Sequence, residues 1–118
     1  MILADSLEGQ AKQAADRINQ LVGENRAIPV QLDASNTASV INLLEHYRID
    51  AFVSGTPYAF NQGLTQAAIE TRSGMTDLGG NNDVVHAQLE MSARTAQAGI
   101  SFVPDCGLGP GMTTTLAL

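Results

Sequence analysis

The chain of 118 residues contains a single cysteine, Cys106, and no long apolar run. One cysteine excludes an internal disulfide framework and is typical of a reducing compartment. A transmembrane helix needs about 20 consecutive apolar residues, which the sequence does not have. The N-terminus also lacks the basic start and apolar run of a secretory signal. These absences predict a cytoplasmic protein with no membrane-spanning segment.

Positive charge is scarce as well. Six Lys and Arg stand against twelve Asp and Glu, for a formal net charge of -6. No basic cluster could bind a phosphate backbone, and no predicted helix has the Lys/Arg-rich face of a peripheral membrane protein. Nucleic-acid and membrane partners are therefore disfavoured. The apolar content of 44% is that of an ordinary folded protein, and the length allows one domain at most.

Short apolar runs alternate with amphipathic stretches along the chain. The runs predict strands over residues 1–4, 28–32, 49–54, 75–78 and 100–103. Helical periodicity lies between them, over about residues 6–22, 37–48, 61–71 and 83–98. Ser6 is the expected N-cap of the first helix. Alternation at this spacing predicts an α/β fold with a mainly parallel sheet and right-handed crossovers.

In such a sheet, ligands bind beyond the carboxyl ends of the strands. The segments at these ends are rich in Asp and Gly: Asp5, Asp33, residues 55–57, residues 77–82 and residues 105–111. A carboxylate at Asp5 could accept both hydroxyls of an adenine ribose, or could instead cap the next helix or lie in a surface turn. Neither of the next two residues, Ser6 and Leu7, is an arginine that could bind a ribose 2′-phosphate, so NAD is favoured over NADP.

Several other segments allow two interpretations each. The turn from Gly107 to Gly111 has the spacing G-x-G-x-G and is a weak match to a phosphate loop, so a tight connection is favoured. Gly79 and Gly80 could bring the backbone close to a ligand or form a plain turn. Asp77 and Asp105 could be general acid/base groups, although capping carboxylates are commoner.

Metal and thiol chemistry have little support. His46 and His86 have no third ligand at a suitable spacing, so no metal site is expected. Cys106 has no histidine near it in the sequence, which favours a buried or half-buried thiol over a nucleophile.

Four segments carry a resemblance to a known family. They are residues 54–61 (SGTPYAFN), residues 65–70 (TQAAIE), residues 77–81 (DLGGN) and residues 103–112 (VPDCGLGPGM). Across most of its length the chain resembles the NAD-binding domain of the lysine 6-dehydrogenase and saccharopine dehydrogenase family, and it looks closer to the lysine 6-dehydrogenase branch. The resemblance implies a pyridine-nucleotide oxidoreductase that acts on the carbon–nitrogen bond of an amino acid.

The resemblance also implies roles for single residues. Asp5 looks like the ribose-binding acid, with Asp33 near the adenine, and Gly55, Thr56 and Pro57 would border the cofactor. Gly79 and Gly80 would lie nearer the nicotinamide and the substrate. Asn61 and the candidate catalytic residues, Tyr58 and Asp77, would lie there too. The turn over residues 105–111 would line the site.

Members of this family begin with a strand and a glycine-rich turn upstream of the position of Asp5, and continue into a substrate domain after the PGM block. Residues 1–118 therefore look like an incomplete Rossmann-like, doubly wound domain without its first βα unit and without a substrate domain. We expect such a chain to be inactive alone, to bind NAD poorly, and to form homo-oligomers through strand edges without neighbours. The alternatives are an oxidoreductase of carbonyl substrates and a non-catalytic interaction module.

Overall fold

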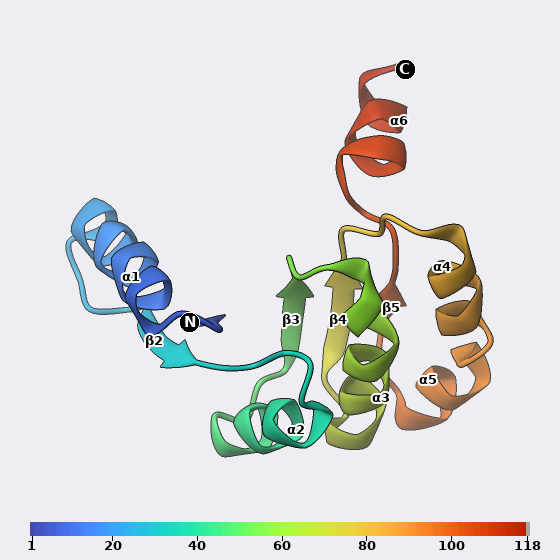
Figure 1. Cartoon of the computed structure of the whole chain (residues 1–118), viewed down its shortest axis with the longest axis horizontal. Helices are drawn as coiled ribbons and strands as arrows, with labels where there is room; N and C mark the ends of the chain where they lie inside the picture. The colour runs from blue at the N-terminus through green and yellow to red at the C-terminus, as the bar shows by residue number, and fades with distance from the viewer. Residues whose placement is uncertain (118) are drawn as a thin grey trace.

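The computed structural model describes residues 1–117. Its strands and helices alternate along the chain, as Figure 1 shows. The strands are β1 (Ile2–Asp5), β2 (Ile28–Gln31), β3 (Ala51–Ser54), β4 (Gly74–Asp77) and β5 (Phe102–Val103). The helices are α1 (Glu8–Val22), α2 (Thr37–His46), α3 (Asn61–Thr71), α4 (Asn82–Leu89), α5 (Ser92–Ala98) and α6 (Thr113–Leu116). The predicted α/β class is confirmed.

The strands form two sheets rather than one. β1 pairs with β2, and the second sheet has the order β3-β4-β5. Each strand pair is parallel, as predicted from the alternation of strands and helices. Within the described residues, β1 has β2 as its only neighbour and β3 has β4 as its only neighbour. The Rossmann-like architecture therefore consists of two bodies, a β1-α1-β2 unit and a larger unit around the second sheet (Figure 1).

Polar contacts of one side chain hold the turn between α1 and β2 in the β1-α1-β2 unit. The side chain of Asn19 in α1 accepts hydrogen bonds from the backbone N–H groups of Arg26 and Ala27, both at 2.8 Å, and donates to the Ala27 carbonyl at 3.0 Å. Gly23 ends α1 in the left-handed conformation, with φ 75°. This conformation costs little at glycine, and α1 ends at Val22, as the predicted helical range over residues 6–22 implies.

The larger unit contains the main apolar core. Val40 and Leu44 of α2 pack with Leu64, Ala67 and Ala68 of α3 and with Met75 of β4. Around them lie half-buried apolar side chains from neighbouring strands and loops, among them Phe52, Phe60 and Phe102. α2 and α3 thus cover one face of the three-stranded sheet.

Two details of the predicted helices are wrong. The single helix predicted over residues 83–98 is broken in two at Met91, whose ψ of 1° leaves the helical range. The Met91 N–H bonds to the Gln88 carbonyl three residues back, and both α4 and α5 contact α3 after this tightened turn. Ser6 is not the cap of α1, because the helix begins one residue later and Leu7 occupies the N-cap position.

Among the residues that the structure describes, none of the helices has the combination of length and apolar character that crossing a bilayer requires.

Candidate functional site at the strand ends

The carboxyl ends of β3, β4 and β5 lie along one edge of the sheet (Figure 1). The loops that follow them contain residues 55–57, residues 78–81 and residues 104–107. These loops include most of the residues that the sequence singles out for a ligand site. The structure therefore brings the loops after β3, β4 and β5 to one edge, as expected for a parallel sheet.

Asp77, the last residue of β4, joins two of these loops. Its side chain is fully buried. One carboxylate oxygen, Oδ1, accepts the N–H of Gly79 at 2.8 Å and the N–H of Asp105 at 3.1 Å. The backbone carbonyl of Asp77 accepts the N–H of Cys106 at 2.8 Å. The loop after β4 is thus bound directly to the loop after β5.

The glycines of the two loops are required by this close packing. Gly79 has φ 70°, and a Cβ atom there would lie 1.6 Å from Oδ1 of Asp105. A Cβ atom at Gly107 would lie 2.3 Å from the Leu78 carbonyl oxygen. Any larger residue at either position would push the loops apart. The close approach at Gly79 is therefore made within the chain, and the residue is not a plain turn glycine.

The second oxygen of Asp77 faces a buried glutamine. Gln88 of α4 is fully buried, and its Nε2 donates to Oδ2 of Asp77 at 2.8 Å and to Oγ1 of Thr65 at 2.9 Å. Its Oε1 is also buried and makes no hydrogen bond to any described residue. An unpaired buried acceptor of this kind costs about 1–3 kcal/mol.

From Thr65 the hydrogen bonds continue to the loop after β3. Oγ1 of Thr65 donates to the Asn61 carbonyl at 2.8 Å. Oγ of Ser54 donates to Oδ1 of Asn61 at 3.3 Å, so its contact of 3.0 Å with Thr56 has Thr56 as the donor. We call these six residues the buried polar network: Asp77, Gln88, Thr65, Asn61, Ser54 and Thr56. The network connects the loops after β3, β4 and β5 through side chains that lie beneath the strand-end edge, within the fold.

The two candidate catalytic residues differ in access. Tyr58 is 44% exposed, and its ring lies against Gly80, where a Cβ atom would be 3.3 Å from Cδ1. The structure thus places Tyr58 beside the loop after β4. Asp77 is at 0% exposure, with both of its carboxylate oxygens in hydrogen bonds within the chain. Its surroundings correspond to the capping role that was the alternative for this residue.

Asp5 and Asp33 lie at the carboxyl end of the other sheet. Asp5 is paired in register with Gln31, two residues before Asp33. Oδ1 of Asp5 accepts the Leu7 N–H at 2.8 Å at the start of α1, so this exposed carboxylate does serve the helix end. Two hydrogen bonds from Ser35 to Asp33 lower the pKa of the Asp33 carboxyl below its usual value. The bond from the Ser35 hydroxyl has the larger effect, and the bond from its backbone N–H the smaller one.

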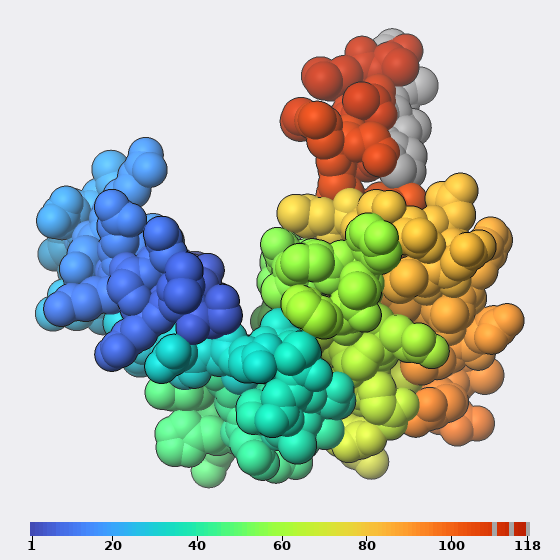
Figure 2. Space-filling view, in the orientation of Figure 1, coloured from blue at the N-terminus to red at the C-terminus, as the bar shows by residue number. Residues whose placement is uncertain are grey.

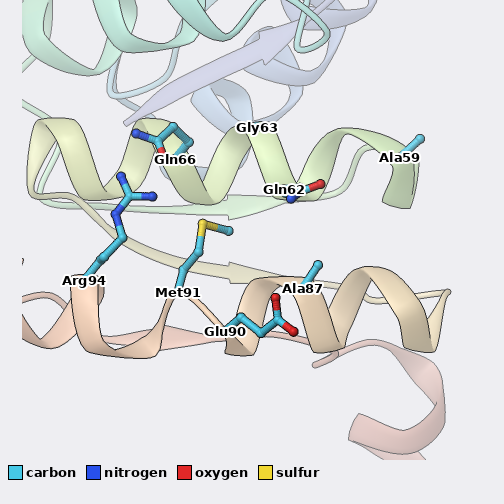
Figure 3. Close-up of a pocket in the computed structure, with 8 residues that line it drawn as sticks. All are labelled: Ala59, Gln62, Gly63, Gln66, Ala87, Glu90, Met91 and Arg94. Atoms are coloured by element: carbon cyan, nitrogen blue, oxygen red, sulfur yellow. The ribbon is translucent and has the colours of Figure 1, made fainter.

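A separate groove of about 640 Å³ runs between α3 and the α4–α5 pair (Figure 3). Gln62 and Gln66 lie on one wall, with Glu90 and Arg94 on the other. No residue that the sequence analysis assigned to a site lines this groove. It lies on the helical face rather than at the strand ends, so we do not place the dinucleotide there.

The structure corrects one expectation about Cys106. The thiol is exposed rather than buried or half-buried, although the backbone N–H of the same residue bonds to the Asp77 carbonyl. Within residues 1–117, three or more His, Cys, Asp or Glu side chains do not come close enough to form a metal site.

The parallel strands, the helices between them and the loops at the strand-end edge together define a Rossmann-like α/β domain. The sequence model of one family, described as the saccharopine dehydrogenase NADP binding domain, matches residues 1–103. The chain therefore belongs to this family, and the resemblance inferred from the motifs is confirmed. It is a nicotinamide-dinucleotide-binding domain of a dehydrogenase-type family. NADP is the dinucleotide in the family's description, which gives no support to a preference for NAD.

A solved structure shows the same fold. The chain is similar to apo saccharopine dehydrogenase (L-Glu forming) from Saccharomyces cerevisiae, with a TM-score of 0.73 and 22% sequence identity. The match covers 98% of this chain and 23% of the yeast enzyme. The chain thus spans less than a quarter of the length of that enzyme.

Gln88 and Thr65 are not among the site residues predicted from the sequence. Both are polar residues at positions where the helical period expects an apolar one. Gln88 follows Val84 by four residues, and Thr65 precedes the buried Ala68 of α3 by three. A polar residue on the buried stripe of an amphipathic helix was the available signal.

Proposed function

We propose that this chain supplies the dinucleotide-binding part of an oxidoreductase that acts on the carbon–nitrogen bond of an amino acid. Lysine 6-dehydrogenase-like oxidative deamination is the form we favour, and a saccharopine-type reaction is the other. The observation that supports it most is the pair of joined loops, DLGG after β4 and PDCG after β5, at the ligand-binding edge of a domain of this family.

When bound, the dinucleotide would supply a hydride acceptor for the amine-bearing carbon of the substrate, and the amine nitrogen would lose a proton. The resulting C=N bond then takes up water and the nitrogen leaves as ammonia or as an amino acid. The domain's part is to bind the cofactor and to fix the position of the nicotinamide ring. Tyr58, exposed beside Gly80, is our candidate for a proton-transferring group in the full enzyme.

The cofactor-binding residues would lie along both sheets. Asp5 would bind the adenine ribose, with Asp33 near the adenine, and Gly55, Thr56 and Pro57 would border the pyrophosphate and nicotinamide half. Gly80 would face the nicotinamide, while Gly79 keeps the loop bound to Asp105. The negative charge of Asp5 disfavours a 2′-phosphate, so we propose NAD as the cofactor, against the NADP of the family's description.

A calorimetric titration with NADH and NADPH tests this proposal. Two proteins would be compared: the 118-residue chain, and the same chain extended at its N-terminus by a strand and a glycine-rich turn. Such a turn supplies backbone N–H groups at a helix N-terminus for the pyrophosphate. We expect the extended protein to bind NADH in the micromolar range, as is common for cofactor sites, and the 118-residue chain to bind poorly.

The variant Asp5→Asn in the extended protein tests the choice of cofactor. Removing the charge should weaken NADH binding and improve NADPH binding, so the ratio of the NADPH to the NADH dissociation constant should fall. Tighter binding of NADPH by the unmodified protein would contradict our cofactor assignment. Binding of neither dinucleotide by the extended protein would contradict the dehydrogenase proposal and favour an interaction module.

The substrate class needs the full-length enzyme. We expect NAD reduction with lysine or saccharopine and none with sugars or aldehydes. Activity on a carbonyl substrate alone would instead identify a different oxidoreductase that shares this domain.

A further inference from the structure

We propose that Gln88 is a positioning residue, which holds Asp77 so that the loops after β3, β4 and β5 keep one fixed arrangement at the strand-end edge. That Gln88 fixes the loops through Asp77 is argued from the hydrogen bonds of the structure alone. Its consequence for cofactor binding rests on the proposed function. The test below separates the two.

The direction of the hydrogen bonds in the network is fixed by Asp77. Its two carboxylate oxygens are acceptors, so Gln88 must present Nε2 to Oδ2. The same Nε2 also serves Thr65, whose hydroxyl proton goes to the Asn61 carbonyl. Gln88 therefore cannot rotate its amide to find a partner for Oε1 without placing an oxygen against the carboxylate of Asp77.

Gln88 is thus kept in an orientation that leaves one of its own buried atoms unpaired. An apolar side chain of similar size would avoid that loss and would still fill the space between α3 and α4. What it could not do is bind Oδ2 of Asp77. Because Oδ1 of the same carboxylate binds Gly79 and Asp105, fixing Oδ2 fixes the rotation of the carboxylate and the position of both loops.

Gln88 is also connected to the loop after β3, through its hydrogen bond to Thr65. Through Thr65, Asn61 and Ser54 the hydrogen bonds reach Thr56, which is a proposed cofactor-binding residue. Thr65 and Asn61 are buried to within 1% of full burial, so water does not compete for these bonds. The three loops of the proposed site are thereby coupled through one helix side chain.

The test is a reversal of donor and acceptor in the 118-residue chain. Gln88→Glu places two carboxylates at the 2.8 Å contact and should break it. In the double variant Asp77→Asn with Gln88→Glu, the amide introduced at position 77 can donate to the carboxylate introduced at position 88, while the amide oxygen still accepts from Gly79 and Asp105. Gln88→Met removes the amide without adding charge. Gln97→Glu, on the exposed surface of α5, is the matched control for the added charge.

The readout is residue-resolved amide hydrogen exchange, which does not require a cofactor. We expect Gln88→Glu and Gln88→Met to speed exchange at Gly79 and Asp105 on the order of tenfold to a hundredfold. Exchange at Ala68 and Met75 in the core should change much less. The double variant should return Gly79 and Asp105 to within about threefold of the wild-type rates, and Gln97→Glu should change nothing.

Three results would overturn the positioning role. One is unchanged exchange at Gly79 and Asp105 in Gln88→Met. Another is that the Gln88 variants accelerate exchange at the core amides as much as at Gly79 and Asp105, which is the result expected if Gln88 only stabilises the fold. The third is a double variant in which Gly79 and Asp105 exchange as fast as they do in Gln88→Glu.

A separate binding measurement uses the N-terminally extended protein and NADH. Weaker binding by Gln88→Met is expected there. Absence of binding by the unmodified extended protein would count against the proposed function while leaving the exchange result valid.

Discussion

The two bodies of the molecule bury very different side chains. In the β1-α1-β2 unit, the buried apolar residues are all alanines: Ala11, Ala15 and Ala27. Around the three-stranded sheet, the buried apolar residues include Val40, Leu44, Leu64 and Met75. Figure 2 shows the first body standing apart from the second, with an open space between them on the side in view. Helices with a similar apolar periodicity in the sequence are therefore buried to different degrees in the two bodies.

The difference lies in the neighbours of each sheet rather than in the helices. α1 has 15 residues and an apolar face, yet Leu7 is 62% and Leu21 is 79% exposed. A two-stranded parallel sheet offers too little surface to cover that face, whereas the three-stranded sheet has α2 and α3 on one side. An amphipathic helix thus predicts a buried face only where a sufficient partner surface exists.

Truncation of one leucine in each body should give the largest contrast. Leu64→Ala removes a side chain from the core and should lower the free energy of unfolding by about 2–5 kcal/mol. Leu21→Ala removes an exposed side chain of the same type and should change it by less than about 0.5 kcal/mol. Urea unfolding followed by circular dichroism measures both.

This pair is internally controlled, since the chemical change is the same and only the burial differs. Equal losses for the two variants would mean that Leu21 is covered in solution, and the contrast between the two bodies would be wrong.

The free edges of β1 and β3 predict a smaller, concentration-dependent effect. Val53 on β3 is 70% exposed, and within the described residues β3 has a neighbour on one side only. Unpaired backbone groups on an apolar strand edge favour association with other chains. We expect the chain to form homo-oligomers, and Val53→Lys to shift it toward the monomer in sedimentation velocity experiments.

Gln97→Lys is the matched control, because it adds the same charge on the exposed face of α5 away from the strand edges. If Gln97→Lys dissociates the oligomer to the same extent as Val53→Lys, then net charge rather than the strand edge controls association. A monomer at every concentration would contradict the prediction itself.

Much of this architecture follows from local sequence. The apolar runs predict β1 to β4 to within about two residues, because a short apolar run bounded by turn residues is typical of a strand in a parallel sheet. Gly23 marks the end of α1 for a local backbone reason. Strand-end placement of Asp5, Asp77 and Gly79 follows from the chain order alone.

What the sequence could not predict depends on contacts between distant segments. The break at Met91 has no glycine or proline to mark it. The role of Gln88 depends on Asp77, Thr65 and the backbone of residues 79 and 105, which meet only in the folded chain. The division into two sheets reflects which strands find neighbours, and no local pattern encodes that.

The most direct test of this comparison is amide hydrogen exchange along the whole wild-type chain under native conditions. We predict that the slowest amides lie in α3 and β4, and that those of β1, α1 and β2 exchange on the order of a hundredfold faster, because the first body can open without disturbing the core of the second. Equal protection in both bodies would contradict the account, since it would show a single cooperative unit.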